Sequence, residues 1–174
     1  MGIEQMQQAL EASSINVQKH QEQLRLENIS ALKKFCADEQ LAQFLTTYSF
    51  DDDITVGAFN YFQANLLKKN IEWEDDFKRA LAVNLLPVGN GTSGDIVVLD
   101  LLDLLDLLDF EIGILFHDYF WENEEEDPRK FLIKMNCSIG QFYLNSVQEN
   151  NYPVDAYEAA AYMGADFTGF AGEE

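Results

Sequence analysis

The chain has 174 residues, of which 47% are apolar and 13% aromatic, and its 31 acidic and 11 basic residues give a net charge of −20. This apolar content excludes a disordered acidic chain, and the length predicts one domain with a sizeable core. The scarcity of Lys and Arg argues against binding to nucleic acid or to an anionic membrane surface, because both require clustered positive charge.

The first 14 residues contain acids and no apolar run, so we expect no secretory signal. The most apolar segment, Ile96 to Leu108, is too short and carries too many Asp residues to span a bilayer. Cys36 and Cys137 form no CxxC pair and no disulfide framework. Together these features predict a cytoplasmic protein with reduced thiols.

Apolar residues at helical spacing fill the first part of the chain. Residues 1–26 predict an N-terminal helical extension, and a stripe from Ile29 to Tyr48 predicts helix that Asp38 can cap part-way. A further stripe from Val56 to Leu67 follows three Asp residues and predicts another helix, and residues 72–81 predict a short one.

Strand patterns follow. Residues 83–88 contain Pro87, which indicates an edge or terminating strand. Residues 96–101 and 112–120 are rich in β-forming residues and predict two more strands, and residues 131–135 predict a short one. We expect two C-terminal helices: one is capped by Asn136 or Ser138, and the other runs from Pro153 to Tyr162 and stops at Gly164. The fold class predicted is α+β, an antiparallel sheet of about four to six strands packed with helices.

An Asp residue recurs at every third position between the strands expected at 96–101 and 112–120, in the sequence Leu-Asp-Leu-Leu-Asp-Leu-Leu-Asp-Leu-Leu-Asp. This spacing predicts an amphipathic helical turn or a 3₁₀ segment. A short surface helix that covers a sheet edge is the favoured interpretation, and an acidic recognition ridge is the functional one.

A second acidic segment, residues 122–127, follows a run of aromatic residues and ends at Pro128. Its charge density predicts a solvated hairpin tip, and aromatic side chains beside carboxylates suit contact with Arg or Lys. The candidate partner-binding residues are therefore Asp100, Asp103, Asp106, Asp109, Asp118, Tyr119, Trp121, Glu122, Glu124, Glu125, Glu126 and Asp127.

Known catalytic and metal-binding patterns fit poorly. The glycine-rich segment of Gly89, Gly91, Gly94 and Asp95 lacks the Lys of a phosphate-binding loop and predicts a structural turn between two strands. Two histidines are too few for the usual metal sites, so His117 with nearby carboxylates is the remaining enzymatic option. We therefore predict no catalytic residues, no metal and no cofactor.

The negative charge is unevenly distributed. Residues 1–50 carry a net charge of −2 and residues 51–174 carry −18, and twelve acids lie between Asp95 and Asp127 without a Lys or Arg among them. A solubilising coat is one explanation, and a surface for a cationic partner is the other.

The central segment, residues 83–149, resembles the SUKH superfamily, which includes bacterial immunity proteins and fungal regulators of cell-wall and glucan synthesis. The residues that carry the resemblance are Leu86-Pro87-Val88-Gly89, Gly91, Gly94-Asp95, Val98-Leu99-Asp100-Leu101, Ile114-Leu115-Phe116-His117-Asp118 and the helix pattern Ser138 to Leu144. The resemblance implies a single SUKH-like α+β domain over residues 1–174.

For the bacterial members, the resemblance implies a non-enzymatic immunity protein that neutralises a cognate toxin, often a nuclease. The acidic half of the chain suits such a cationic toxin domain, because a nuclease needs positive charge to hold its substrate. The alternatives are a regulatory or scaffold module, a small hydrolase that uses His117, and a nucleic-acid mimic.

Overall fold

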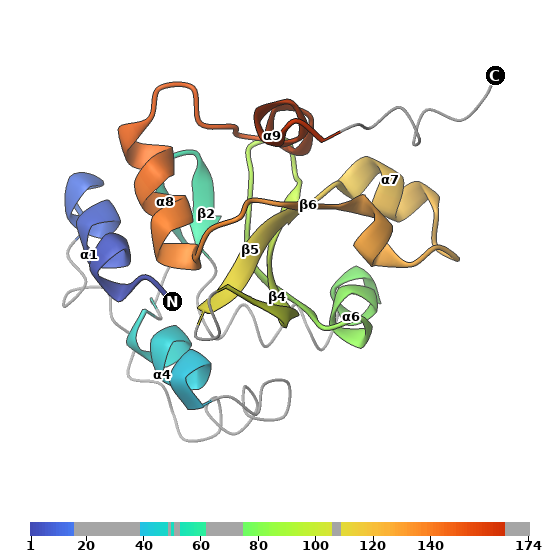
Figure 1. Ribbon diagram of the computed structural model, residues 1–174, viewed down its shortest axis with the longest axis horizontal. Coiled ribbons are helices and arrows are strands. Elements are labelled where there is room, and N and C mark those ends of the chain that lie inside the picture. The colour runs from blue at the N-terminus through green and yellow to red at the C-terminus, as the bar shows by residue number, and fades with distance from the viewer. Residues whose placement is uncertain (16–38, 49, 51–52, 62–74, 106–108, 166–174) are drawn as a thin grey trace.

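The computed structural model describes residues 1–15, 39–48, 50, 53–61, 75–105 and 109–165 (Figure 1). Within these residues the chain forms a six-stranded antiparallel sheet and six α-helices. The α+β class and the antiparallel sheet predicted from the sequence are therefore confirmed.

Strands that are consecutive in the sequence are neighbours in the sheet, in the order β1-β2-β3-β4-β5-β6. Every neighbouring pair is antiparallel. The strands are β1 (Ile54–Val56), β2 (Phe59–Tyr61), β3 (Leu85–Asn90), β4 (Ile96–Leu105), β5 (Asp109–Leu115) and β6 (Leu132–Lys134).

The hairpin of β1 and β2 replaces the helix that we predicted from Val56 onward. Gly57 adopts a φ of 62°, which most side chains disfavour, and so allows the tight turn. The flanking side chains alternate between the core and the surface, with Val56 and Phe59 fully buried. Burial that alternates every two residues thus decides the structure here, although the apolar spacing also fits a helix. Residues 62–67 of the expected helix lie outside the described residues.

The prediction of an edge strand around Pro87 was wrong for β3 as a whole, because β3 lies between β2 and β4. Pro87 is tolerated because β2 pairs only with Gly89 and Asn90, at the far end of β3. A register shift between Pro87 and Gly89 separates the two halves of the strand. Gly89 is thus part of a strand rather than the predicted turn, and a Cβ there would lie 2.3 Å from the Asn60 carbonyl oxygen.

The Asp-Leu-Leu repeat does not form the predicted helical or 3₁₀ insertion. Instead β4 continues through it to Leu105 and pairs with the start of β5. A register shift between Asp100 and Leu104 accommodates a three-residue repeat within a strand whose side chains alternate every two residues. Asp106 lies outside the described residues, and Asp103 and Asp109 are described only through their backbone.

The strand predicted over residues 112–120 was also too long, because β5 ends at Leu115. The chain then forms α7 (His117–Glu122), which carries His117 and Tyr119 on a helix instead of a strand face. The acidic segment that follows leads into a 3₁₀ helix, η1 (Pro128–Phe131), so it connects two helical turns and is not a hairpin tip.

Most predicted helices are present in the described residues. They are α1 (Ile3–Ala12), α4 (Glu39–Thr47), α6 (Asp75–Ala82), α8 (Ile139–Gln148) and α9 (Ala156–Met163). Ser138 caps α8 and Gly164 ends α9 with a φ of 65°, as predicted, although α9 begins after the cap Asp155 and not at Pro153. Asp38 and the rest of residues 16–38 lie outside the described residues.

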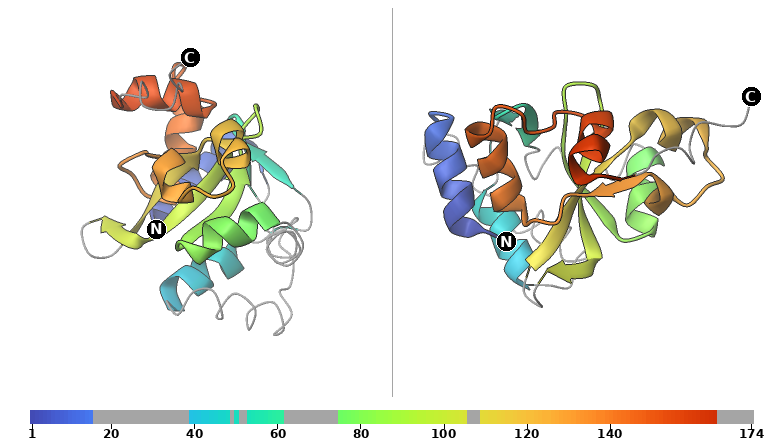
Figure 2. Two further views of the ribbon diagram at one scale, coloured as in Figure 1. Left: turned by 90° about the vertical axis from the view of Figure 1, so that its right-hand side faces the viewer. Right: turned by 45° about the horizontal axis from the view of Figure 1, so that its top comes forward.

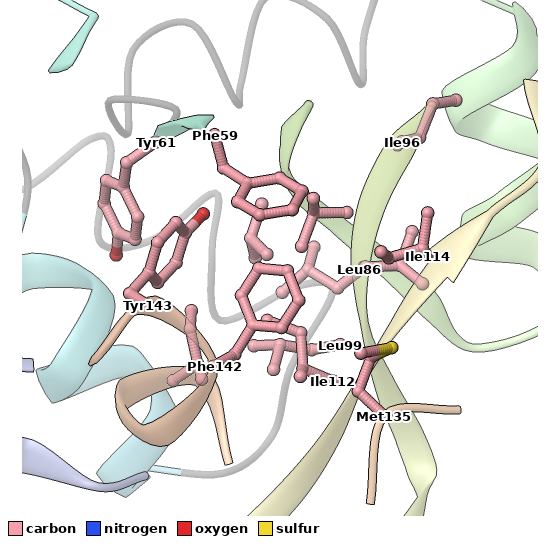
Figure 3. Close-up of a cluster of buried hydrophobic side chains, with 14 of the residues drawn as sticks. Phe59, Tyr61, Leu86, Ile96, Leu99, Ile112, Ile114, Met135, Phe142 and Tyr143 are labelled. Carbon is pink, nitrogen blue, oxygen red and sulfur yellow. The ribbon is translucent and has the colours of Figure 1, made fainter. Parts of the chain in front are cut away.

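Helices cover both faces of the sheet (Figures 1 and 2). Leu99 and Ile112 lie near Phe142 of α8, and Tyr143 of the same helix packs against Phe59 and Tyr61 of β2, in one aromatic and aliphatic core (Figure 3). The opposite face is covered by α6 and η1, and α1 packs against the outer side of α8. No helix among the described residues has the length and apolar character needed to cross a membrane.

Candidate functional site

Asp95 joins three elements at the end of the sheet where β4 begins. Its buried carboxylate accepts hydrogen bonds from the backbone N–H of His117 at 3.0 Å and from that of Ala156 at 2.7 Å. Ser93 of the β3–β4 turn adds a third hydrogen bond at 3.1 Å. Asp95 therefore fixes the first residues of α7 and α9 to the β3–β4 turn. We predicted Asp95 only as a turn residue, so its structural role is larger than predicted.

The His117 imidazole lies between two carboxylates. Its Nδ1 is 2.8 Å from Asp95 Oδ1, and its Nε2 is 2.9 Å from Asp118 Oδ1. The ring also lies beside Gly94, whose φ of 93° favours glycine, and makes an edge contact with Trp121 at 5.4 Å. Both ring nitrogens are thus engaged within the chain, as expected for a hydrogen-bonded structural histidine.

The outer surface of α7 brings together several predicted partner-binding residues. Asp118 and Trp121 are exposed there, and Tyr119 is half-buried against Phe116 and Phe131. Arg79 of α6 donates hydrogen bonds to the carbonyl oxygens of Phe120 and Asn123 and so stabilises the carboxyl end of α7. Sequence reasoning missed this contact, because nothing near Arg79 in the sequence indicates a partner 41 residues away.

The acidic loop, defined here as residues 122–127, contains five of the predicted residues. Glu122, Glu124, Glu125, Glu126 and Asp127 are all exposed. Asp127 also caps η1 through the backbone N–H of Arg129 at 2.9 Å, and Glu126 forms an ion pair with Lys130. Glu122, Glu124 and Glu125 extend the same exposed acidic surface from α7.

Asp100 is not part of an exposed ridge. Its carboxylate is buried and forms an ion pair with Arg129, whose guanidinium also donates to the Val83 carbonyl oxygen at 3.0 Å. The Lys134 ammonium lies 3.8 Å from the same carboxylate. This side chain is therefore removed from the set of candidate partner contacts in the folded protein.

Glu111 is a buried acid that sequence reasoning missed. It lies opposite Asp100 across β4 and β5, accepts a hydrogen bond from the Asn136 N–H, and lies 3.6 Å from Lys134. Burial, together with the charge of Asp100, raises the pKa of Glu111 above its ordinary value. The available signal was its position between apolar neighbours in a strand, a signal that Asp100 shares.

The described residues line cavities at two places away from His117. One of about 630 Å³ lies between α1 and α4, and one of about 510 Å³ lies beside α9, and neither includes His117. In the described part of the chain no group of three or more His, Cys, Asp or Glu side chains is placed to hold a metal ion. Burial raises the pKa of the Cys137 thiol to about 11, which keeps it protonated near neutral pH.

Comparisons with known proteins identify no relative of this chain. No protein-family model, no curated protein and no solved structure matches the chain. The resemblance to the SUKH superfamily therefore stays a prediction from the motif residues.

Proposed function

We propose that this protein is a non-enzymatic immunity protein whose acidic surface binds and neutralises a cationic, nuclease-type toxin domain. The observation that carries the proposal is the exposed acidic loop next to Asp118 and Trp121. Asp118, Glu122, Glu124, Glu125 and Asp127 are exposed in this region, as is Glu126, which pairs with Lys130, and their carboxylates give it a net negative potential.

Electrostatic complementarity of this kind accelerates association and favours one partner over another. An inhibitor of a nuclease benefits on both counts, because the nuclease must display positive charge to hold its substrate. The predicted SUKH resemblance, whose bacterial members are mostly inferred to be immunity proteins, supports the proposal further.

The hydrolase alternative is less well supported. A general base needs a ring nitrogen directed at a substrate, whereas Nδ1 of His117 faces Asp95 and Nε2 faces Asp118. Neither of the two cavities described above includes His117. The regulatory alternative shares the same acidic surface and differs only in the identity of the partner.

The test is to express the genes adjoining that of this chain, alone and together with it. We expect one neighbouring product to be toxic, and co-expression of this chain to restore growth. A non-toxic neighbourhood together with stable capture of one of the cell's own proteins would favour the regulatory alternative and contradict the proposal.

Matched variants then connect protection to the acidic loop. Replacing Glu124, Glu125 and Glu126 by Gln should weaken protection. The control replaces Glu4, Glu11 and Glu39 of α1 and α4 by Gln, which makes the same change in net charge at exposed positions in the N-terminal helices. Equal protection by both triple variants would exclude the acidic loop as the binding surface.

A further inference from the structure

Two exposed aromatic side chains and a carboxylate lie together where α7 meets α9, and we call them the aromatic patch: Asp118, Trp121 and Tyr157. Trp121 is 54% exposed and Tyr157 is 60% exposed, although both carry large apolar rings. The side chain of Asp118 is 56% exposed. Large aromatic side chains concentrate in the energetically important centres of protein interfaces.

Trp121 and Asp118 both contact His117 at the start of α7, and Tyr157 of α9 contacts Phe116, the residue directly before α7. Tyr157 packs edge-on against Phe116 with ring centres 4.3 Å apart, and Trp121 packs against His117, whose Nε2 is 2.9 Å from Asp118. Partial desolvation, followed by the neighbouring Tyr119 and Asp118, raises the pKa of Tyr157, as expected if Tyr157 lies near Asp118. Figure 1 and the right view of Figure 2 show α7 and α9 on adjacent parts of the surface.

Buried hydrogen bonds fix the position of Asp118 in the aromatic patch. The buried Asp95 fixes Nδ1 of His117 at 2.8 Å, and His117 in turn holds one oxygen of Asp118. Asp95 also accepts the first backbone N–H of α9, so the same carboxylate sets the start of both helices. Binding to such a surface costs little ordering of side chains, which strengthens the complex.

We propose that the aromatic patch is the docking site for an arginine side chain of a cationic protein partner. This inference rests on the proposed function, because it assigns the contact residues of that same acidic surface. A guanidinium pairs with a carboxylate in a fixed planar geometry and stacks on aromatic faces, whereas the ammonium of Lys does neither as well. Asp118 supplies the carboxylate, Trp121 and Tyr157 supply the rings, and the acidic loop supplies the surrounding negative potential.

The experiment measures the affinity of the full chain for fluorescein-labelled octa-arginine and octa-lysine peptides by fluorescence anisotropy at one fixed ionic strength. The two peptides carry the same charge, so a difference between them reports guanidinium recognition and not charge alone. We expect the wild-type chain to bind octa-arginine roughly fivefold more tightly than octa-lysine.

Three variants separate the aromatic patch from the acidic loop. Asp118→Asn and Trp121→Leu should each bring the ratio of the two affinities close to one. The variant with Glu124, Glu125 and Glu126 replaced by Gln should bind both peptides more weakly, and its ratio of octa-arginine to octa-lysine affinity should stay as in the wild-type chain. Circular dichroism checks that each variant is folded, and Asp118→Asn keeps an oxygen that can accept the hydrogen bond from His117.

The outcomes distinguish the two proposals. If both peptides bind but the wild-type chain shows no preference, or if Asp118→Asn and Trp121→Leu keep the preference, the arginine site is overturned and the acidic surface stands. If neither peptide binds the wild-type chain, the proposed cationic partner is contradicted together with the docking site.

Discussion

The carboxylates of the central segment fall into two groups that differ in their surroundings. Asp95, Asp100 and Glu111 are buried and accept hydrogen bonds or ion pairs from within the chain. The acidic loop, by contrast, extends its carboxylates into solvent. The two groups therefore differ in surroundings: Asp95 and Asp100 hold separate elements of the fold together, whereas Glu122, Glu124 and Glu125 are exposed to solvent.

The largest expected effect on stability comes from Asp95. Asp95→Ala leaves the backbone N–H groups of His117 and Ala156 buried without an acceptor, and we expect a loss of about 3 kcal/mol or more in the free energy of unfolding. Urea denaturation followed by circular dichroism measures it. The control is Asp155→Ala, which removes the exposed N-cap of α9 and should lower the free energy of unfolding by about 1 kcal/mol. Equal losses would remove the distinction between the buried and the surface carboxylate.

The next effect tests the buried ion pair between Asp100 and Arg129. Arg129→Met leaves the buried Asp100 carboxylate without its main partner and should lower the free energy of unfolding by about 3 kcal/mol, whereas Asp100→Leu leaves the partly exposed Arg129 guanidinium and should cost less. The double variant replaces both charges by apolar groups and should be more stable than either single variant, as a double-mutant cycle of unfolding free energies would reveal. Strictly additive losses would contradict the assignment of a coupled pair.

A smaller, pH-dependent effect is expected at Glu111. Its pKa is raised in the folded protein from an ordinary value of 4.5, so the folded state binds this proton more tightly than the unfolded state. The penalty for burying its charge is absent below about pH 4.5 and grows as the pH rises through the folded pKa. Relative to Glu111→Gln, the wild-type chain should therefore lose stability as the pH rises above about 4.5. Parallel stability curves for the two proteins would contradict a raised pKa.

The smallest effect on stability is expected in the acidic loop. Replacing Glu124, Glu125 and Glu126 by Gln should change the midpoint of urea unfolding little, because the side chains are exposed and the surface ion pair of Glu126 with Lys130 contributes little to stability. A large destabilisation would mean that the exposed acids also support the fold, and the comparison with the buried group would fail.

The sequence predicted the elements with strong local signals. Ser138 and Gly164 mark helix ends through capping and left-handed backbone, which depend on a few neighbouring residues, and both were predicted. Residues 56–61 and the Asp-Leu-Leu repeat were predicted as helical, because their apolar spacing also fits a helix. The strand pairing that decides the outcome depends on the neighbouring strand in each case.

The candidate site was predictable only in part. Runs of acids and aromatic residues point to α7 and the acidic loop, where Asp118, Trp121 and the five acids of the loop are exposed. The separation of Asp100 from that set depends on Arg129, 29 residues further along the chain, and the fixing of His117 depends on Asp95, 22 residues earlier. Burial and long-range pairing of this kind are properties of the folded chain and leave little trace in local sequence.

The most direct test of the central claim is to compare octa-arginine binding by two triple Gln variants of equal net charge. One replaces Glu124, Glu125 and Glu126 of the acidic loop, and the other replaces Glu4, Glu11 and Glu39 of the N-terminal helices. If the exposed acids of the loop form the binding surface, only the loop variant should bind several-fold more weakly than the wild-type chain. Equal weakening by both variants would contradict the account, because binding would then follow total charge alone.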